Sequence, residues 1–319
     1  MIAPGKLVIA LFLLAAAGPN VQPPPGQEDE LAPLREKLAD EPAFVEAVRS
    51  FDRVHVHLAE ADALMGSKLR ENGQEEAAKE RFDSARAHVE LVRKAYAFAL
   101  KHYPNNARLH NFYGELLLDY FKDPSAAAKE WNTALMLDDE LAAAHNNLGM
   151  YLLHGGRYSE GLRHMERALD LDDENPDFLF NMAQIYLIHG PQVQARHDWS
   201  ERKVYKEAME MSKKAAKLAP EDFDILQDYA VNFFAAENFG VDAKWKHAAR
   251  AWEDAREHAR NDTERFYTWL NEARAWIRKG DEEEAGRCLL KALELRPQSD
   301  VAKRLLEGLE LDGQGFETP

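Results

Sequence analysis

Residues 142–175 read AAAHNNLGMYLLHGGRYSEGLRHMERALDLDDEN, and this stretch decides the fold. Its pattern of Leu, Gly and Ala recurs along the chain at a period of about 34 residues, which is typical of a helical solenoid. A single solenoid unit cannot bury its apolar face alone, so neighbouring units share a core and leave one long concave surface exposed. The period therefore predicts an all-α solenoid whose function is to bind another molecule.

The repeat divides most of the chain into units, of which three agree closely with one another. Residues 107–141 and 266–299 follow the scheme of 142–175, and weaker copies fill the remaining stretches. The predicted units are 59–106, 107–141, 142–175, 176–222, 223–265 and 266–299. Because an open stack needs polar ends, we expect a helical cap at 31–58 and a capping helix with a tail at 300–319.

The residues at the repeating positions resemble those of the tetratricopeptide repeat family, whose unit is a pair of antiparallel helices. In 142–175 the matching residues are His145, Leu148, Gly149, Leu152, Gly156, Tyr158, Gly161, Met165 and Ala168. The unit departs from the family pattern at Asp173, where the family has proline. The resemblance implies a right-handed superhelix of about six helical hairpins that binds a protein or an extended peptide in its concave groove.

Units 176–222 and 223–265 carry extra residues between their helices. We expect these residues to lengthen the second helix of each unit, over 194–218 and 241–259. Both stretches lack internal Gly and Pro and keep apolar residues at three- and four-residue steps.

Small residues stand at one position of the first helix in three units, as Gly114, Gly149 and Ala183. A Gly inside a helix costs about 1 kcal/mol relative to Ala, so its recurrence indicates a packing need. We expect these residues to let the two helices of a unit approach closely, and a Leu in place of Gly149 to destabilise the array by overpacking.

The charge of the chain excludes some classes of partner. Acidic residues outnumber Lys and Arg by 56 to 40, for a formal net charge of −16. Binding to nucleic acid needs clustered Lys and Arg, and so does binding to an anionic membrane surface. We therefore expect a protein or peptide partner and no nucleic acid.

The first residues are typical of a secretory signal. Lys6 is followed by an eleven-residue apolar run at 7–17 that ends in three alanines. The run is too short to cross a membrane, which takes about 20 residues, and small residues suit a signal peptidase. We expect a signal peptide at 1–17, a Pro-rich and acidic linker at 18–30, and a secreted or periplasmic protein. The alternative is an uncleaved segment that anchors the protein in a membrane.

Polar residues at the sixth position of four successive units form the main candidate site. They are Asn147, Asn181, Asp228 and Asn271, whereas the first two units have Leu64 and Phe112 there. An amide both donates and accepts, so a column of amides is suited to bind a peptide backbone. In tetratricopeptide-like proteins that bind extended peptides, an asparagine ladder at this position does so. The alternative is that Asn only caps or spaces helices there.

Further residues on the same helices are expected to face the groove, among them Asn146, Gln184 and Arg274. Changing Asn147, Asn181 and Asn271 to Ala is expected to weaken binding and to leave folding nearly intact. Trp199 and Trp245 lie in the extra segments of two units, and Trp is favoured in binding hot spots. They form a candidate second contact edge, unless each ring only packs against its neighbouring helix.

The chain shows no motif for catalysis or for a metal. Twelve histidines and one cysteine are present, but no nucleophile elbow, phosphate loop or HExxH pattern accompanies them. His110 and His145 fall at equivalent packing positions, and Cys288 reads as a small buried hydrophobe. We expect no enzyme activity, no cofactor and no metal site.

The sequence thus predicts an exported scaffold or adaptor that binds a protein or peptide in the groove of a tetratricopeptide-like superhelix. Two alternatives stay open. One is a structural homo-oligomer built by repeat stacking, and the other is the recognition subunit of a separately encoded enzyme.

Overall fold

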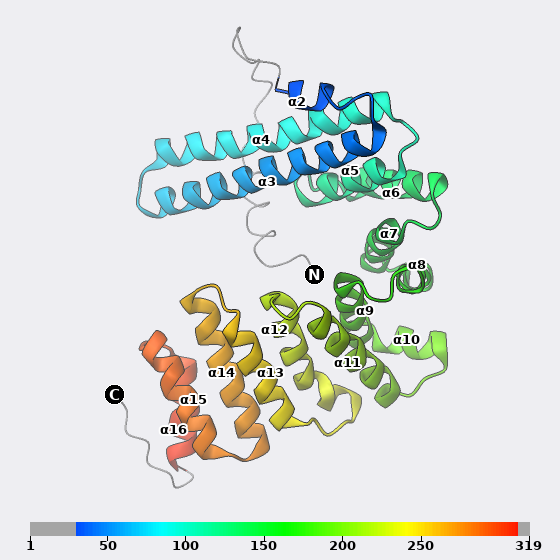
Figure 1. Cartoon of the computed structure of the whole chain (residues 1–319). Coiled ribbons are helices and arrows are strands. Elements are labelled where there is room, and N and C mark those ends of the chain that lie inside the picture. Colours follow the sequence, from blue (N-terminus) through cyan, green and yellow to red (C-terminus); the bar gives the residue numbers. More distant parts are fainter. Residues whose placement is uncertain (1–29, 312–319) are drawn as a thin grey trace. The chain divides into compact units, whose positions relative to one another are not determined.

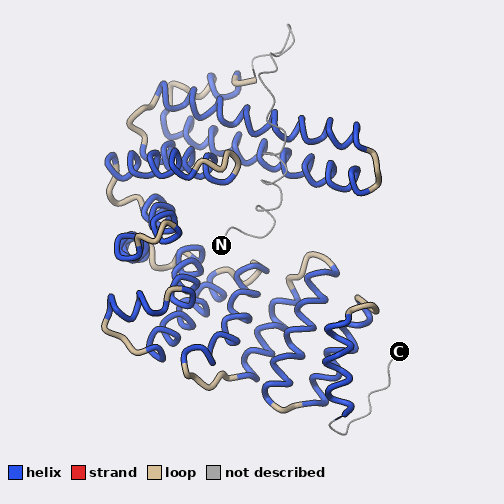
Figure 2. Tube along the Cα trace, turned by 180° about the vertical axis from the view of Figure 1, so that it is seen from behind, coloured by secondary structure: helices blue, strands red, loops and turns tan. Residues whose placement is uncertain are grey.

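The computed structural model describes residues 30–311, and every regular element in that range is a helix (Figures 1 and 2). The predicted all-α class is confirmed. The predicted signal peptide at 1–17 lies outside the described residues, as do residues 18–29 of the predicted linker and 312–319 of the tail.

The chain divides into two compact units, Met1–Leu171 and Asp172–Pro319. In the N-terminal unit, a short lead helix precedes three antiparallel helix pairs, α3 with α4, α5 with α6, and α7 with α8. Its helices are α2 (Ala32–Arg35), α3 (Glu41–Glu71), α4 (Glu75–His102), α5 (Ala107–Asp119), α6 (Pro124–Leu137), α7 (Ala142–His154) and α8 (Tyr158–Leu171). Figure 1 shows α3 and α4 as one long hairpin in blue and cyan.

The C-terminal unit pairs α9 with α11, α12 with α13 and α14 with α15, and ends in the single helix α16. Its elements are α9 (Pro176–Ile188), α10 (Gly190–His197), α11 (Glu201–Leu218), α12 (Phe223–Asn232), the 3-10 helix η1 (Phe233–Phe239), α13 (Trp245–Glu257), α14 (Asp262–Lys279), α15 (Glu282–Leu295) and α16 (Asp300–Leu311). Within each of the two units, successive pairs pack on one another, as α6 does on α7 and α13 on α14.

Successive pairs share their cores, as a solenoid requires. Leu148 and Leu152 of α7 pack in one buried cluster with Trp131 of α6 and Leu117 of α5. Each helix therefore buries apolar surface against its partner and against the next pair.

Local sequence explains where the helices begin. Asn106 accepts a hydrogen bond from the backbone N–H of Leu109 at 3.0 Å and caps α5, and Asp123 caps α6 in the same way. Between α7 and α8, Gly156 takes a positive φ of 76°, which glycine adopts without strain. Polar residues and glycines between helices thus set where the helices begin and end.

Helix α3 runs without a break through position 58, where the sequence analysis ends the cap. Residues 43–65 contain no Pro or Gly, so nothing in them stops a helix. Helices α3 and α4 have 31 and 28 residues, against 13 and 14 in the pair α5 and α6. This length explains why 59–106 is only a weak copy of the repeat.

The expectation that extra residues lengthen the second helix of unit 176–222 over 194–218 is wrong for 194–200. Helix α11 has 18 residues, against 14 in α6 and α8, but begins only at Glu201. The other extra residues lie before it. They form the separate helix α10, which is followed by Asp198 in the left-handed conformation with φ 54°. Ser200 then caps α11 by accepting from the Lys203 N–H at 3.3 Å. Asp tolerates the left-handed region better than most residues, so a helix can end there without Gly or Pro.

The same expectation for unit 223–265, over 241–259, is also wrong. The extra residues form η1 and the loop at 240–244, and α13 begins only at Trp245. Gly240, with φ 60°, ends η1 and turns the chain.

His110 near the start of α5 and His145 near the start of α7 make equivalent hydrogen bonds. In each, the Nε2 atom bonds a backbone carbonyl six residues earlier, that of Pro104 at 2.9 Å and that of Asp139 at 3.1 Å. The Nδ1 atoms reach the second helix of the pair, at Glu130 (2.6 Å) and His164 (2.8 Å). These histidines are packing residues, as their repeat position predicts.

The small residues allow the close helix contacts predicted for them. A Cβ atom on Gly149 would lie 2.8 Å from the Met165 side chain and 3.1 Å from the Gly161 carbonyl oxygen. One on Gly114 would lie 2.5 Å from the Trp131 ring. At these positions any larger side chain forces the two helices apart.

We expect Gly161→Ala to destabilise the protein by about 1–3 kcal/mol through overpacking. Its Cβ would lie 2.6 Å from Leu153 Cγ and 2.9 Å from the Gly149 carbonyl oxygen, which is backbone and cannot rotate away. The control is Gly308→Ala in α16, where nothing lies within 4 Å. That change should stabilise the protein by roughly 0.5–1 kcal/mol, because Ala favours the helix. Urea unfolding of both variants checks this, and a Gly161→Ala protein as stable as the wild type would refute the close contact.

Candidate functional site

A chain of hydrogen bonds connects the first helices of the N-terminal unit. Arg49 on α3 donates to Asp52 at 2.8 Å and to Glu115 on α5 at 3.0 Å. Asp52 is buried and also accepts from the hydroxyl of Tyr96 on α4 at 2.7 Å. Arg49 further lies over the Phe112 ring, 4.3 Å from its centroid. Asp52 and Glu115 therefore share one guanidinium, which residues of α3 and α5 hold in place, and burial raises the pKa of Glu115.

Asn147 extends this network to α7. Its amide nitrogen donates to Asn111 Oδ1 at 3.1 Å and to Glu115 Oε1 at 3.2 Å, and Asn111 itself donates to Glu115 at 2.9 Å. The neighbouring Asn146 is buried and donates to Asn147 Oδ1 at 3.4 Å. The Asn147 amide nitrogen therefore bonds two oxygens within the protein, and this member of the predicted ladder joins two repeats.

The C-terminal unit has a corresponding network that is more deeply buried. Gln184 on α9 donates to the carboxylate of Asp228 on α12. Asn232 donates to Asp228 at 2.8 Å and to Ser212 Oγ of α11 at 3.1 Å. All four side chains are buried. Burial raises the pKa of Asp228 to about 7, although the donors around the carboxylate favour its charged form.

The two networks occupy the same repeat positions. Glu115 and Gln184 are each the ninth residue of their unit, and Asn147 and Asp228 are each the sixth residue of the following unit. Where the ninth residue is apolar, as at Val231, the sixth residue of the next unit is Asn271, which accepts from Arg274 at 2.9 Å instead. Asn181 lies half-buried on α9.

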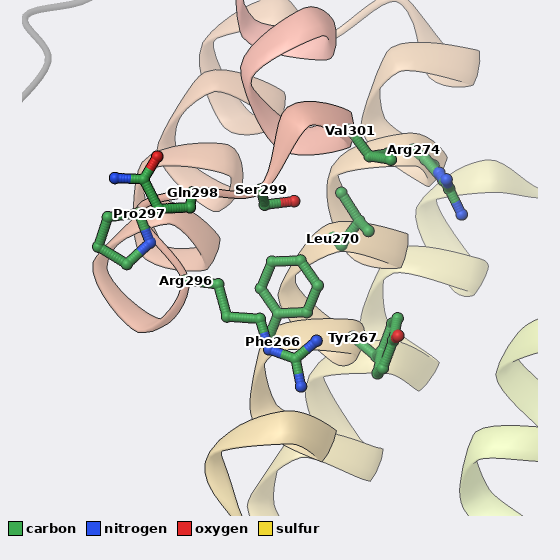
Figure 3. A pocket seen from close by; sticks show the side chains of 9 residues that line it. All are labelled: Phe266, Tyr267, Leu270, Arg274, Arg296, Pro297, Gln298, Ser299 and Val301. Carbon is green, nitrogen blue, oxygen red and sulfur yellow. The ribbon is translucent and has the colours of Figure 1, made fainter.

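A pocket of about 560 Å³ opens where α14 meets the α15–α16 connection, within the C-terminal unit (Figure 3). We call it the arginine pocket. It is lined by Phe266, Tyr267, Leu270, Arg274, Arg296, Pro297, Gln298, Ser299 and Val301. Tyr267 and Val301 are large apolar residues that stay 46% and 38% exposed, so the pocket presents apolar surface to its opening.

Two guanidinium groups flank the apolar surface of this pocket. Arg296 lies over the rings of Phe266 and Tyr267, 4.7 and 5.3 Å from their centroids, and donates to Thr263 Oγ1 at 2.7 Å. Arg274 lies on the other side of Leu270 in Figure 3. Within residues 30–311 neither arginine pairs with a carboxylate, although most other arginines of the chain do.

Trp199 and Trp245, the candidate second contact edge, are both half-buried. The Trp199 ring stacks on His197 with centroids 4.3 Å apart. Trp245 contacts the Phe234 ring at 5.4 Å, and the Arg278 guanidinium lies 5.7 Å from its centroid. Each ring packs against its own neighbours and stays partly exposed, so the second contact edge stays a prediction.

The part of the chain that the structure describes offers little for metal binding or for nucleophilic chemistry. It holds no group of three or more His, Cys, Asp or Glu side chains arranged to bind a metal ion. Cys288 is buried, and burial raises the pKa of its thiol, so it is a poor nucleophile. None of the helices in 30–311 has both the length and the apolar character needed to cross a membrane.

The sequence analysis did not predict several residues of these sites. Arg296 lies in a connection between helices, where the repeat pattern has no assigned contact. Arg49 lies outside the predicted array, and Ser212 and Asn232 are buried through contacts between helices. Among these, only Glu115 could be found from the sequence, because it occupies the same ninth repeat position as Gln184.

Comparison with known proteins identifies the repeat. Residues 142–175 and 266–299 each match a family model of the tetratricopeptide repeat. No curated protein matches the sequence. A similar solved structure is YrrB, described as a tetratricopeptide repeat protein with an unusual peptide-binding site. It is 19% identical, with a TM-score of 0.50 over 67% of this chain and 99% of that chain.

PilW, described as a widely conserved type IV pilus biogenesis factor, is similar as well. It is 14% identical, with a TM-score of 0.51 over 78% of this chain and 98% of that chain. At these identities the two structures show the fold alone, and they agree with the family that the sequence resembles.

The network predicts unequal roles for the ladder residues. We expect Asn147→Ala to lower the free energy of unfolding by about 1–3 kcal/mol, because it leaves Oδ1 of the buried Asn111 without its donor and removes one of the donors to Glu115. Asn271→Ala, at the equivalent position but bonded only to exposed Arg274, should change stability by less than about 0.5 kcal/mol. Chemical denaturation of both variants measures the difference, and equal losses would show that Asn147 does not join the repeats.

Proposed function

We propose that this chain, which belongs to the tetratricopeptide repeat family, is an exported scaffold that binds an extended segment of a partner protein in the arginine pocket. The fold is that of a protein-binding scaffold, and proteins built from this repeat are generally not enzymes. The observation that carries the proposal is a pocket that combines exposed apolar surface with two arginines lacking an acidic partner.

The apolar part of the pocket requires an apolar side chain from the partner. Phe266 and Leu270 are buried at its base, whereas Tyr267 and Val301 remain partly exposed to water. Covering such surface yields about 25 cal/mol per Å² of apolar area removed from water. A cavity of about 560 Å³ has room for a Leu, Phe or Met side chain together with the neighbouring residues of an extended segment.

The arginines add a requirement for negative charge. In a chain with 56 acidic residues against 40 basic ones, most arginines in 30–311 pair with a carboxylate, but Arg274 and Arg296 do not. Guanidinium groups bind carboxylates through short, charge-assisted hydrogen bonds. The partner segment should therefore carry a carboxylate close to its apolar side chain, either from Asp or Glu or from a chain terminus.

The four residues of the predicted ladder have different roles in this proposal. Asn271 holds Arg274 at the pocket through their hydrogen bond of 2.9 Å. Asn181 is retained as a residue that contacts the peptide backbone, whereas Asn147 and Asp228 join neighbouring repeats. The similarity to YrrB shows the fold alone and does not locate a site on this chain.

Photo-crosslinking in the native host tests the pocket. A photo-crosslinking amino acid placed at Gln298, an exposed residue of the pocket, should capture one partner protein. The same amino acid at Met136, which is 79% exposed on α6, serves as the control and should not. Arg274→Ala should reduce capture at Gln298 about tenfold, the effect of losing one hydrogen bond to a charged group.

Three results would contradict the proposed pocket. They are equal capture at Gln298 and Met136, capture that does not depend on Arg274, and crosslinks only between copies of this chain. The last of these favours the structural homo-oligomer.

Export is supported by the sequence of residues 1–17. Lys6, the apolar run and the small residues before Gly18 suit a cleaved signal. We expect intact-mass measurement of the protein from its native cells to show a mature chain that begins near Gly18. A full-length chain recovered with the membranes would instead establish the anchor.

A further inference from the structure

A second pocket, of about 370 Å³, lies in the C-terminal unit between α11, η1 and the loop at 240–244. We call it the lysine pocket. It is lined by Arg202, Tyr205, Lys206, Met209, Glu210, Lys213, Tyr229, Phe233, Val241, Asp242, Ala243, Lys244 and His247. It shares no residue with the arginine pocket, so what it binds is separate from the proposed function.

Aromatic residues form the base of the lysine pocket. Tyr205 and Phe233 are buried, and Tyr229 contacts the Phe233 ring edge-on with centroids 5.3 Å apart. Arg202 donates to the Gly240 carbonyl oxygen at 3.0 Å and holds the loop against α11. The pocket is therefore built on packed elements and presents an apolar base inside a fixed wall.

Lys206 and Lys213 of this pocket differ from Lys203 and Lys214 of the same helix, α11. Lys203 pairs with Glu207 at 2.6 Å and Lys214 pairs with Asp173 at 2.7 Å. The ammonium groups of Lys206, Lys213 and Lys244 have no hydrogen bond or ion pair with any residue in 30–311. Glu210 stands four residues after Lys206, yet the two form no ion pair.

The pocket is locally positive on a strongly acidic protein. Arg202 and three lysines stand against two carboxylates, those of Glu210 and Asp242. The chain as a whole carries a formal charge of −16. An anionic ligand is therefore repelled by most of the surface and attracted here.

The spacing of the lysines indicates how far apart the negative charges of the ligand lie. Lys206 and Lys213 are seven residues apart on α11, which at about 1.5 Å per residue separates them by about 10 Å. A peptide in the polyproline II conformation has three residues per turn and advances about 3.1 Å per residue, so acidic side chains three positions apart lie on one face, about 9 Å from each other. An aromatic or aliphatic residue between them meets the aromatic base.

We propose that the lysine pocket binds an acidic peptide segment in which two carboxylates three residues apart flank an apolar side chain. The carboxylates pair with Lys206 and Lys213, and the apolar side chain covers Tyr229 and Met209. The protein thereby has a second contact for a partner, on residues that the repeat pattern does not assign to binding.

Fluorescence anisotropy with a labelled peptide that contains Glu-Phe-Ser-Glu tests this inference on the full mature chain. The peptide should bind, and binding should weaken as salt is raised, because partly exposed charges are screened. A Gln-Phe-Ser-Gln analogue should bind about tenfold more weakly. A wild-type protein that binds neither peptide, or both equally, overturns the proposal.

Matched variants separate a specific site from general charge. Lys206→Gln combined with Lys213→Gln should weaken binding of the acidic peptide about tenfold. The control combines Lys203→Gln with Lys214→Gln, which removes the same charge from the same helix and should leave binding unchanged. Equal effects of the two pairs would show that only net charge matters and would overturn the site.

A third variant distinguishes the two pockets. Arg274→Ala should leave binding of the acidic peptide unchanged, because Arg274 does not line the lysine pocket. If Arg274→Ala abolishes binding and the change at Lys206 and Lys213 does not, the peptide occupies the arginine pocket. That result overturns this inference and leaves the proposed function intact.

Discussion

The structure depends on the close contact between the two helices of a repeat. Gly149 of α7 and Gly161 of α8 face each other so closely that a Cβ on Gly161 would lie 2.9 Å from the Gly149 carbonyl. This proximity lets Leu148, Leu152 and Trp131 share one core across neighbouring pairs. Without it, each pair would expose the apolar face that the next pair covers, and the solenoid would lose its continuous core.

Hydrogen bonds between repeats complement this apolar contact. They give two residues of the predicted ladder, Asn147 and Asp228, a role in joining repeats. Glu115 bonds Asn147, and Gln184 bonds Asp228, across equivalent positions of successive repeats. A buried polar network of this kind is stable only when every member has a partner, and it fixes the register of the helices it joins. The same repeat position thus serves the fold at Asn147 and Asp228, and remains available near the arginine pocket at Asn271.

Both pockets lie where the repeat becomes irregular. The arginine pocket needs Arg296 from the α15–α16 connection and Val301 from the start of α16. The lysine pocket needs the loop at 240–244 that follows η1. Regular repeats use their recurring geometry to pack on each other. Extra or terminal segments are free of that constraint, so they bring charged side chains next to apolar surface.

The sequence alone determined the all-α class, the helix pairs of 107–141, 142–175 and 266–299, and the packing roles of Gly149 and His145, because these follow from local spacing and side-chain size. It predicted the wrong outcome for 194–200 and 241–259, where Asp198 and Gly240 turn the chain through backbone conformations that composition does not reveal. Only the tertiary structure decided that Asn147 and Asp228 are bonded internally and that Arg296 lies beside Tyr267. Such contacts join residues far apart in the chain, and no local pattern records them.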